Sequence, residues 1–506
     1  MGRRSRDTRH DRGGKGICQL PWRDIVNDYP RLEVLGADQV EAIHEASMDL
    51  LENQGMRVLH AGARELLARA GATVDHAEQM VRFDRGMVME QVALAPSEFT
   101  LHARNPAKNF RVGGKHLAFT SVGGPAYCND LGRGRRRGRF EDACDYLRLV
   151  QSLDIIHQEG GGPFEPIELP AETRHLDLYL SQIRLLDKNW QPIALGAERA
   201  RDAINMARIA FDCSAEELAE RPALFAIINT NSPLQLDIPM AEGLIELASA
   251  GQAVCVTPFT LAGAMAPVTL AGTLAQQNAE ALAGITLTQV VRPGAPAVYG
   301  AFTSNVDMRS GSPAFGTPEY AKAAQASGQL ARRYGLPFRS SSVTSSNVVD
   351  AQSTYESAMS LWAAITGGAN IIVHAAGWLE GGLTASFEKL IVDAEMLQMM
   401  AAYLEPIEVT PATLALDAIA EAGPGGHFFG VQHTMSRYQT AFYQPFLSDR
   451  RNFETWQEAG SEDSQLRAGR IWKNLLEHYQ QPPLDPAVDK ALEDYVARRK
   501  SGDIHL

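Results

Sequence analysis

One pattern recurs through the middle of the chain: a short apolar run, a loop rich in glycine, proline, serine or asparagine, and then a segment with helical periodicity. Eight predicted strands lie between His116 and Leu379, in the runs HLAFTSVGGP, DIIHQEGGGPF, WQPIALG, ALFAIINTNSP, AVCVTPFTLAG, AVYGAFTSNV, PFRSSSV and NIIVHAAGWLEGG. Strands buried on both faces read as short apolar runs, and eight strand–helix units in about 280 residues are what a (β/α)8 barrel requires. The pattern therefore predicts an α/β protein, a TIM (β/α)8 barrel with N-terminal and C-terminal extensions.

Helix starts support this register. Thr317 is an N-cap residue, followed by Pro318 and Glu319 in the first turn, and Asp350 and Ser386 are N-cap candidates after strands seven and eight. The helix after strand seven has one apolar face, formed by Tyr355, Ala358, Met359, Trp362 and Ile365. The alternative fold, a doubly wound sheet, usually carries a phosphate-binding loop, and neither G-x-x-x-x-G-K-[ST] nor a strand-linked G-x-G-x-x-G occurs here.

The regions that flank the barrel differ from it in pattern. Residues 1–34 begin with a basic segment, and we expect a disordered arm and a lead-in. Residues 35–110 open with the helical DQVEAIHEASMDLLENQG and continue with mixed segments, which predicts a small N-terminal α/β region. The barrel then occupies residues 111–400. Residues 401–506 predict a mainly helical C-terminal extension, with AGRIWKNLLEHY as its clearest amphipathic segment.

Charge and cysteine content exclude several classes of protein. The 506 residues include 60 acids and 47 bases, and the resulting net charge of −13 argues against nucleic acid as a partner. Five widely spaced cysteines without a C-x-x-C predict neither a disulfide framework nor a thiolate metal site, and favour a cytoplasmic location: Cys18, Cys128, Cys144, Cys213 and Cys255. The longest apolar-looking stretch, 253–291, is broken by proline, glutamine and glutamate, so we expect no membrane span.

The carboxyl ends of barrel strands face the active site, so residues just past each strand are candidate site residues. The run Ser340–Ser346 holds five serines and a threonine, a composition typical of a linker, but strand eight follows it and places it at the mouth. Paired glycines occur at three points of this mouth and let a backbone approach a large flat ligand, although each pair alone also fits a tight turn. These glycines are Gly123, Gly124, Gly160, Gly161, Gly162, Gly381 and Gly382.

Aromatic residues at the same end could form a cage for a quaternary cation. They are Tyr127, Phe164, Phe259, Phe302, Phe315 and Trp378. Any one of them is also typical of ordinary core packing. Trp378, which lies between Gly377 and Gly381 and close to Glu380, is the strongest candidate.

Other motifs carry less information. His427 and His433 in GPGGHFFGVQHT have no evident third ligand, which favours structural histidines over a metal site, and we predict no metal. The arginine-rich run from Arg133 to Arg139 is typical of a solvated hairpin tip, with a docking patch for an acidic partner as the alternative. The serines after strand seven lack a G-x-S-x-G setting. We therefore assign no catalytic residue from the sequence.

Several long segments together resemble the trimethylamine methyltransferase family. They include QGMRVLH, APSEFTLHARNP, GGPAYCND, RGRFEDACDYLRLVQSLD, VVDAQSTYESAMSLWAAITGGANIIVHAAGWLEGGLTASFEKLIVDAEML and GPGGHFFGVQHT, and the similarity runs from about Leu35 to Pro486. The resemblance implies a barrel that moves a methyl group from a methylated amine to cob(I)alamin, carried by a separate corrinoid protein, and it implies a homo-oligomer. The corrinoid would approach over Gly123, Gly124, Gly161, Gly162, Gly381 and Gly382.

The resemblance also gives the serine run a meaning. Founding members of the family carry pyrrolysine in the matching segment, and here the equivalent window consists of ordinary residues: Ser340, Ser341, Ser342, Val343, Thr344 and Ser345. A quaternary amine leaves as a neutral tertiary amine, so an enzyme without pyrrolysine need supply only positioning, desolvation and a pocket that accepts a cation. This branch of the family implies glycine betaine or a related substrate. The residues we expect to bind it are His374, Trp378, Glu380, Arg339, Phe302, Tyr127 and Phe164.

Two alternatives stay open at this point. The barrel could act on another methylated compound, such as carnitine, proline betaine, trimethylamine, or a methylated thiol or ether. It could also be a non-catalytic barrel that binds a betaine or tethers a corrinoid protein. Arg339 and His374 bear on the choice between carboxylated and uncarboxylated ligands.

Overall fold

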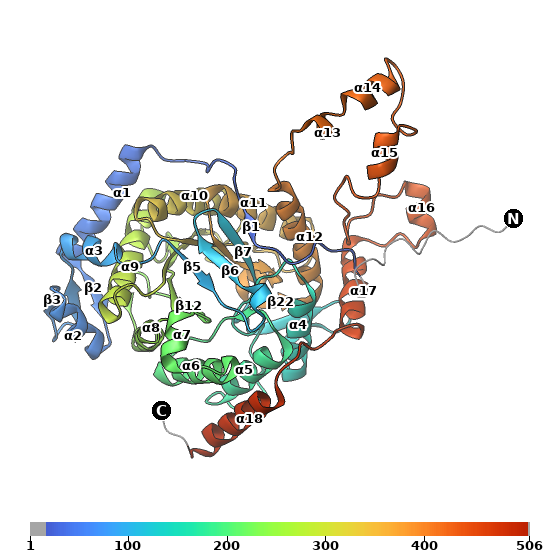
Figure 1. Cartoon of the computed structure of the whole chain (residues 1–506). Coiled ribbons are helices and arrows are strands. Elements are labelled where there is room, and N and C mark those ends of the chain that lie inside the picture. Colours follow the sequence, from blue (N-terminus) through green and yellow to red (C-terminus); the bar gives the residue numbers. More distant parts are fainter. Residues whose placement is uncertain (1–16, 504–506) are drawn as a thin grey trace.

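The computed structural model describes residues 17–503; residues 1–16, the start of the predicted basic arm, lie outside this part. A parallel barrel forms its centre (Figure 1). Its strands pair in the order β11-β10-β7-β20-β19-β16-β14-β12, and a parallel bridge between Trp190 and Leu224 joins the two edges. The strands are β7 (His116–Ser121), β10 (Gln158–Glu159), β11 (Asn189–Trp190), β12 (Phe225–Ile228), β14 (Ala253–Val256), β16 (Ala297–Gly300), β19 (Phe338–Ser341) and β20 (Ile371–Ala376). The predicted (β/α)8 barrel is confirmed, strand by strand.

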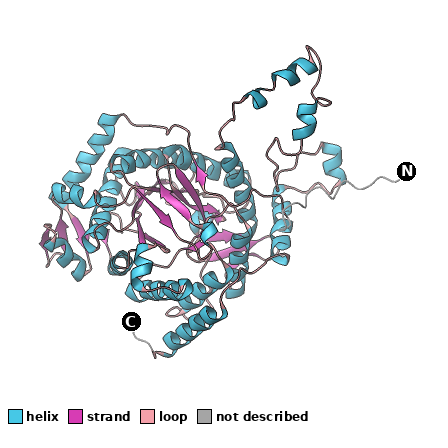
Figure 2. Ribbon diagram, viewed as in Figure 1, coloured by secondary structure: helices cyan, strands magenta, loops and turns pink. Residues whose placement is uncertain are grey.

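Helices surround the strands on all sides (Figure 2). In chain order they are α4 (Phe140–Ser152), α5 (Arg174–Leu185), α6 (Ala197–Phe211), α8 (Ile238–Ser249), α9 (Leu270–Val291), α10 (Pro318–Arg333), α11 (Ala351–Gly367) and α12 (Phe387–Tyr403), with the short α7 (Ala215–Glu220) after α6. The three predicted N-caps are present, because the side chains of Thr317, Asp350 and Ser386 each accept a backbone N–H of the first turn. These caps fix where α10, α11 and α12 begin.

A hairpin closes the barrel at the amino ends of its strands. It consists of β5 (Glu98–Leu101) and β6 (Phe110–Gly113), joined by the 3-10 turn η3 (Pro106–Lys108), and β6 leads directly into β7. Leu101, Phe110 and Val112 pack among residues that the strands turn inward, such as Phe225 and Ile371. The apolar lower half of the barrel is therefore filled, and only the opposite end can open to a ligand.

The N-terminal region is a small α/β unit docked on the barrel. It contains α1 (Ala37–Asp49), the π-helix η2 (Leu50–Gln54), β2 (Met56–Val58), α2 (Ala61–Arg69), β3 (Thr73–Asp75), β4 (Met80–Arg82) and α3 (Arg85–Val92). Its sheet extends to β13 (Gln235–Leu236), which belongs to the loop after β12. The lead-in before α1 is also placed against the barrel: β1 (Ile25–Val26) pairs with β7, and Ile17 and Ile25 are buried.

The C-terminal extension is mainly helical, as its sequence pattern indicates. α17 (Ser464–Glu477) packs on α12 and α4, and α18 (Pro486–Ser501) packs on α5 and α6, where Arg499 and Tyr495 bind the buried carboxylate of Asp202. Residues 405–442 form an arm that projects from the barrel (Figure 1). The arm contains α13 (Pro411–Leu414), α14 (Leu416–Ala422) and α15 (Gln432–Arg437), and α16 (Phe453–Glu458) follows on the way back to α17.

The orientation of α11 differs from the one that its apolar pattern predicts. Tyr355, Met359 and Trp362, which the pattern places on a core-facing stripe, are exposed to solvent. The face toward the barrel instead carries Ser353, Ser357, Ser360 and Leu361. Two of these positions bond to the loop after β19: the carbonyl of Ser357 accepts the hydroxyl of Ser342, and the hydroxyl of Ser360 donates to the carbonyl of Val343. The serine face of α11 is therefore the buried one, because the loop behind the helix is polar and bonds to it.

Within residues 17–503, none of the helices combines the length and the apolar character that a membrane span needs. All five cysteines are free thiols.

Candidate active site

A cavity of about 400 Å³ opens at the carboxyl ends of the strands. Strand ends and the loops that follow them supply its walls. The side chains that matter below are Gln191, Asn229, Met240, Thr257, Phe259, Phe302, Arg339, His374 and Trp378, with Gly123, Gly124, Gly160, Gly161 and Gly382 at the edge. Among the described residues that line this cavity, Arg339 is the one charged side chain.

Arg339 is buried without an acidic partner. It lies in the middle of β19, its residue is 2% exposed, and its Nη1 donates a long hydrogen bond of 3.3 Å to the carbonyl of Ala301. Its Nε has no partner in the described structure, and its guanidinium lies 5.4 Å from the centroid of the Phe302 ring. Burial lowers the pKa of Arg339, yet guanidinium stays charged in proteins. The cavity therefore contains a desolvated positive charge whose hydrogen-bonding capacity is only partly used, with Nε free to donate.

Aromatic rings surround the space beside this charge. Phe302 stacks on Phe259 and Phe315, with centroids 5.2 and 5.5 Å apart. Trp378 stands edge-on to Phe302 at 6.0 Å and to Phe315 at 5.9 Å, and its Nε1 donates to the carbonyl of Thr344 at 3.0 Å. β15 (Phe259–Ala262) and β17 (Phe302–Val306) pair beside the short β18 (Pro313–Ala314) and hold the phenylalanine side chains in register. The cluster presents several electron-rich rings to one space, as a cation site requires.

His374 reaches the cavity through an irregular strand. The pairing of β20 with β7 shifts register between Ile372 and Ala376, and His374 has a φ of 58°, which is uncommon for a side chain other than glycine. Its ring lies 4.4 Å from that of Trp378, and its Nδ1 lies 3.4 Å from the hydroxyl of Ser341. Burial, and secondarily Arg339, hold the pKa of His374 well below its ordinary value. The imidazole is therefore neutral at physiological pH and adds no second positive charge.

Two amide side chains complete the lining. Gln191 follows β11 and Asn229 follows β12, and the side-chain oxygens of both are buried without a partner in the described structure. The substrate-binding residues expected from the sequence include neither of them. The general rule of taking the residue directly past each strand identifies both, Gln191 after the strand that ends at Trp190 and Asn229 after the strand that ends at Ile228.

Three of the expected substrate-binding residues have other partners. Glu380 binds the guanidinium of Arg135, which lowers the pKa of Glu380 against the effect of its burial. The same guanidinium lies over Tyr127, 3.6 Å from the centroid of the tyrosine ring. Phe164 is buried against the ring of Tyr146. None of the three lines the cavity, whereas the other four expected residues, His374, Trp378, Arg339 and Phe302, do.

The arginine-rich run accounts for these contacts. It forms the exposed hairpin of β8 (Tyr127–Asp130) and β9 (Gly134–Arg137), which pairs with β22 (Thr384–Ser386) and, through it, β21 (Trp378–Leu379). Arg133 and Arg136 bind the buried carboxylates of Asp130 and Asp142. The 3-10 turn η4 (Glu380–Gly382), which contains Glu380, closes the loop on the barrel side. The hairpin therefore supports the loop that carries Trp378.

The serine window lies directly behind the cavity wall. Ser340 and Ser341 belong to β19; the hydroxyl of Ser342 donates to the carbonyl of Ser357, and that of Thr344 donates to Glu356. The hydroxyl of Ser345 accepts the backbone N–H of Phe315. Val343 is fully buried. The hydroxyls thus hold the loop after β19 and the aromatic wall in place, and Ser341 is the one that also faces His374.

The glycines serve the mouth in two ways. A Cβ on Gly123 would lie 1.9 Å from the carbonyl of Gly160, and one on Gly382 would lie 2.4 Å from the ring of Trp378, so these residues permit internal contacts. Gly124 has a φ of 82° and open space around its Cβ position. Gly123 and Gly382 therefore have internal packing roles, and among these three glycines Gly124 is the one with open space at the rim. The approach of a flat ligand over the glycines stays a prediction.

Glu159 anchors the glycine loop from behind. It is fully buried at the end of β10, and its carboxylate accepts the backbone N–H groups of Gly161 and Gly162 and the amide of Gln182. Burial raises the pKa of Glu159 to about 7, against the lowering effect of these hydrogen bonds. The wall formed by Gly160 and Gly161 thus depends on one buried carboxyl group.

We expect this carboxyl group to make stability depend on pH. In the unfolded chain it ionises near 4.5, and in the folded protein near 7, so the folded state holds the extra proton between these values. The contribution of Glu159 is therefore fully present below about pH 4.5 and is lost as pH rises through about 7, a change of about 3 kcal/mol. Urea unfolding of the wild type and of Glu159→Gln at several pH values tests this. The difference between their free energies of unfolding should change across that window; a constant difference would contradict it.

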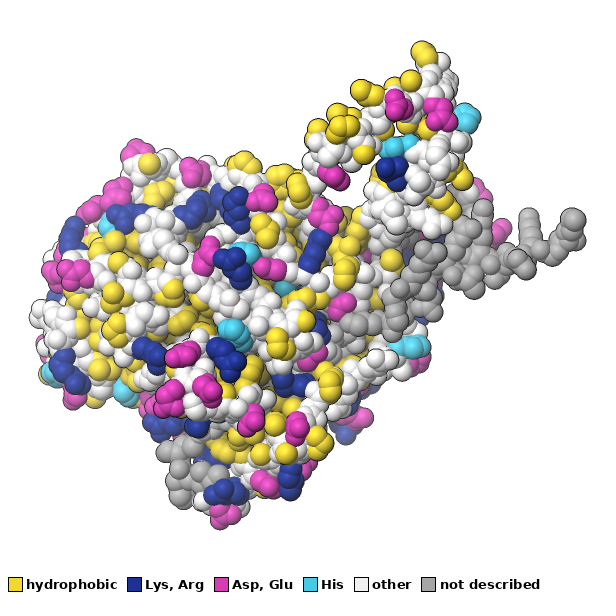
Figure 3. Space-filling model, viewed as in Figure 1, with side chains coloured by type: hydrophobic (Ala, Val, Ile, Leu, Met, Phe, Trp, Pro, Cys, Tyr) yellow, Lys and Arg dark blue, Asp and Glu magenta, His cyan; other side chains and the backbone are white. Residues whose placement is uncertain are grey.

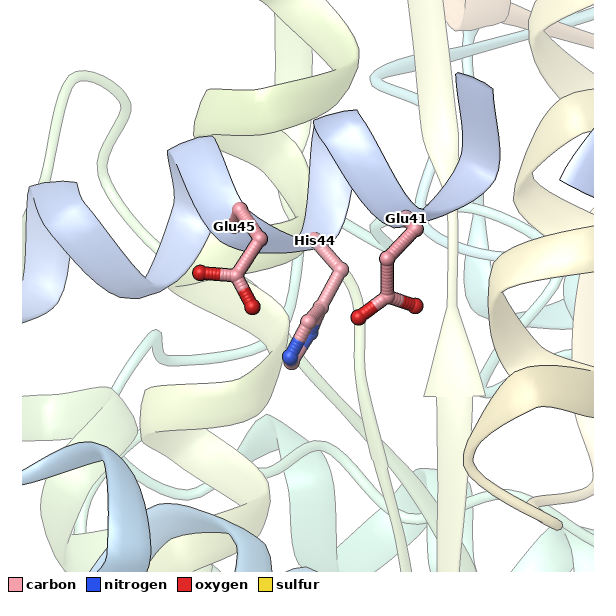
Figure 4. Close-up of side chains that lie close together, drawn as sticks. All are labelled: Glu41, His44 and Glu45. Carbon is pink, nitrogen blue, oxygen red and sulfur yellow. The ribbon is translucent and has the colours of Figure 1, made fainter. Parts of the chain in front are cut away.

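A cluster of metal-type ligands elsewhere is already occupied by protein groups. Glu41, His44 and Glu45 lie together on α1 (Figure 4). Arg333 binds both oxygens of Glu41, Arg85 binds Glu45, and the Nδ1 of His44 bonds to Tyr334. Within residues 17–503 this is the one cluster of at least three such ligands, so His427 and His433 on the arm belong to none.

The sequence comparison gives the family. The family described as trimethylamine methyltransferase matches residues 1–503. The chain belongs to the trimethylamine methyltransferase family. Glycine betaine methyltransferase of Desulfitobacterium hafniense (strain Y51) is 39% identical and aligns with 93% of this chain and 98% of its own length. Trimethylamine methyltransferase MttB2 of Methanosarcina mazei is 28% identical and aligns with 92% of this chain and 94% of its own length. Trimethylamine methyltransferase MttB of D. hafniense (strain DSM 10664 / DCB-2) is 29% identical and aligns with 91% of this chain and 92% of its own length.

This trimethylamine methyltransferase family member is accordingly a methyl-transfer enzyme, as the resemblance implied. The cavity is its candidate active site because it opens at the catalytic end of the barrel and collects the unpartnered polar groups described above.

Proposed function

We propose that this enzyme demethylates a quaternary amine that carries a carboxylate, with glycine betaine as the best fit. Arg339 carries the proposal. A buried guanidinium without an acidic partner is costly unless a ligand supplies the anion, and a carboxylate matches its planar fork. The cavity of about 400 Å³ is also sufficient for a molecule of this size.

The aromatic cluster would hold the other end of the substrate. With the carboxylate at Arg339, a trimethylammonium group one methylene away falls beside Phe302 and Trp378. The unpartnered oxygens of Gln191 and Asn229 give further negative partial charge to the polarised methyl groups. A substrate with opposite charges at its two ends therefore satisfies the arginine and the rings together.

The chemistry needs no acid from the protein. Cobalt(I) of a corrinoid, brought by a partner protein, would supply the nucleophile and accept the methyl group as the C–N bond breaks. The electron pair of that bond stays on nitrogen, which becomes a neutral tertiary amine without taking up a proton. His374 is neutral and cannot act as an acid at pH 7, and the described lining contains no carboxyl group. The lining residues would therefore orient the substrate and exclude water.

The rim is compatible with a large methyl acceptor. Gly124 is exposed, with open space at its Cβ position, and lies beside Gly123 at the cavity mouth. Gly124 would take the edge of the corrin ring. The hairpin β8–β9 beside them presents arginines to an incoming acidic protein, the alternative that the sequence left open for this run.

An uncarboxylated amine such as trimethylamine is the weaker candidate. It would leave Arg339 without an anion and would need its nitrogen protonated or bound in order to leave. Another betaine with a carboxylate would keep the contact with Arg339 and the contact with the aromatic rings. It would differ from glycine betaine in the volume that it occupies in the cavity.

A direct assay tests the proposal. The purified protein is mixed with free cob(I)alamin and, in separate reactions, glycine betaine, carnitine, choline, tetramethylammonium and trimethylamine, and the corrin spectrum is followed. We expect the methylated spectrum to develop fastest with glycine betaine. Binding of betaines without methyl transfer, with free corrinoid and with a purified corrinoid protein alike, would favour the non-catalytic alternative.

A further inference from the structure

Two apolar surfaces on this chain are exposed to solvent. The first is the arm, residues 405–442. Phe429 is 85% exposed and Phe442 is 76% exposed, and other large apolar side chains of the arm are also exposed: Ile407, Val409, Leu414, Leu416, Ile419, Phe428, Met435 and Tyr438. Figure 3 shows hydrophobic side chains, in yellow, along the projecting part of the molecule. Soluble proteins rarely expose so many apolar groups on one segment unless something binds there.

The arm is poor in charge and packs weakly on itself. Between Ile407 and Phe442 its charged residues are Glu408, Asp417, Glu421 and Arg437. A hollow of about 620 Å³ lies between its helices, lined by residues of α13, α14 and α15. Depletion of charge with enrichment of aromatic residues is typical of the centre of a protein interface.

The second surface is the outer face of α11 and α12. On α11, Tyr355, Met359 and Trp362 recur at helical spacing and point outward; Tyr355 is 61% exposed. On α12, Met399 and Tyr403 are also exposed. The ring of Trp362 lies 5.0 Å from that of Tyr403, so the two helices form one continuous apolar band. An amphipathic helix that keeps serines inside and an apolar stripe outside is suited to a partner on that outer side.

The band and the arm adjoin each other. α12 ends at Tyr403, and Ile407 and Val409 at the base of the arm continue the apolar surface. The base of the arm and the Tyr403 end of the band lie at the end of the barrel that is opposite the cavity, because α12 begins near the mouth and ends where Tyr29, next to β1, bonds to the carbonyl of Tyr403. From there the band extends along α11 toward Tyr355, which lies near the start of that helix. A protein that docks at the mouth to deliver the methyl acceptor would therefore not need to cover the base of the arm or the Tyr403 end of the band.

We propose that the occupant is a second copy of this chain, with the arm of each copy lying on the α11–α12 band of the other. With a two-fold axis beside the base of the arm, the arm of the first copy lies on the band of the second, and the arm of the second lies on the band of the first. One dimer therefore covers both apolar surfaces of each chain. Phe428, Phe429, Tyr438 and Phe442, at about 200 Å² for each ring, expose about 500 Å² per arm. Two arms and two receiving bands together reach the roughly 1,200–2,000 Å² of a stable interface. This inference does not depend on the proposed substrate.

Sedimentation of the full chain with paired variants tests the inference. We expect the wild type to sediment at twice the mass of one chain or a higher multiple at micromolar concentration. Phe429→Asp with Phe442→Asp on the arm should lower the mass by at least half, and Tyr355→Asp with Met359→Asp on the band should do the same. These side chains are exposed, so circular dichroism should show unchanged helix content. Met308→Asp, an equally exposed apolar position at the mouth, is the matched control and should leave the mass unchanged.

Each other outcome overturns the proposal. A wild type that sediments as one chain would show that another molecule covers the arm. Dissociation by the arm variant without dissociation by the band variant would show that the arm lies on a different surface of the second copy. Full retention of mass in both variants would place the subunit contact elsewhere.

Discussion

Replacing Arg339 with methionine is expected to lower kcat/KM for glycine betaine by at least about 100-fold. The substrate carboxylate would enter a cavity of low polarity without its counter-charge, and breaking one side of a buried charge pair costs about 3–5 kcal/mol. Methionine retains much of the side-chain volume, so the cavity wall stays filled. Steady-state methyl transfer to cob(I)alamin with a titration of glycine betaine measures the effect.

Three comparisons separate this role from simple damage to the fold. Methyl transfer from tetramethylammonium, which has no carboxylate, should fall far less than transfer from glycine betaine. Arg339→Lys should recover part of the betaine activity, since it keeps the charge and loses the planar fork. The melting temperature of Arg339→Met should stay equal to that of the wild type or rise, because an unpaired buried charge is removed. Equal losses with both substrates, accompanied by a lower melting temperature, would assign Arg339 to structure.

The barrel could be predicted from the sequence because its strands are buried on both faces and its helices are capped by recognisable residues. Each apolar run between His116 and Leu379 became a strand, and Thr317, Asp350 and Ser386 capped the helices expected of them. Such signals are local, so they can be detected without knowing what the elements pack against.

The orientation of α11 could not be predicted in the same way. Its apolar stripe is the stronger pattern, but the loop after β19 presents the hydroxyl of Ser342 and the carbonyl of Val343 to the helix, and these groups require polar partners. The buried face of a helix depends on what lies behind it. Periodicity alone identifies an apolar face and does not say whether the core or another surface covers it.

The sequence indicated which residues lie at the ends of the strands, but it did not indicate which side chains those residues contact. Arg339, His374, Trp378 and Phe302 reach the cavity because they are on or next to strands that end there. Glu380 and Tyr127 also follow strand ends, but Tyr127 begins the hairpin that ends at Arg137, and Arg135 of this hairpin takes both side chains as partners. Long-range ion pairs of this kind leave no local trace in a sequence.

Trp378 has the second large predicted effect, on recognition of the cation. Replacing it with leucine removes the indole face next to Phe302 and should weaken binding of glycine betaine by about 30-fold, since a desolvated cation–π contact contributes about 2 kcal/mol. The isostere 3,3-dimethylbutanoate has the same shape and the same carboxylate but carries an uncharged carbon in place of the positively charged nitrogen. Calorimetric titration of both ligands into the wild type and the variant gives the ratio of their dissociation constants, and this ratio isolates the charge.

The ratio distinguishes a cation site from a merely apolar one. In the wild type, glycine betaine should bind more tightly than 3,3-dimethylbutanoate, and in Trp378→Leu the two affinities should converge. Trp378→Phe keeps an aromatic face and should give an intermediate ratio, although it loses the hydrogen bond from Nε1 to the carbonyl of Thr344. If both ligands weaken equally in the leucine variant, Trp378 acts by filling space. In that case the ammonium group would have to rely on the phenylalanines and on the amide oxygens of Gln191 and Asn229, which the same pair of ligands can test.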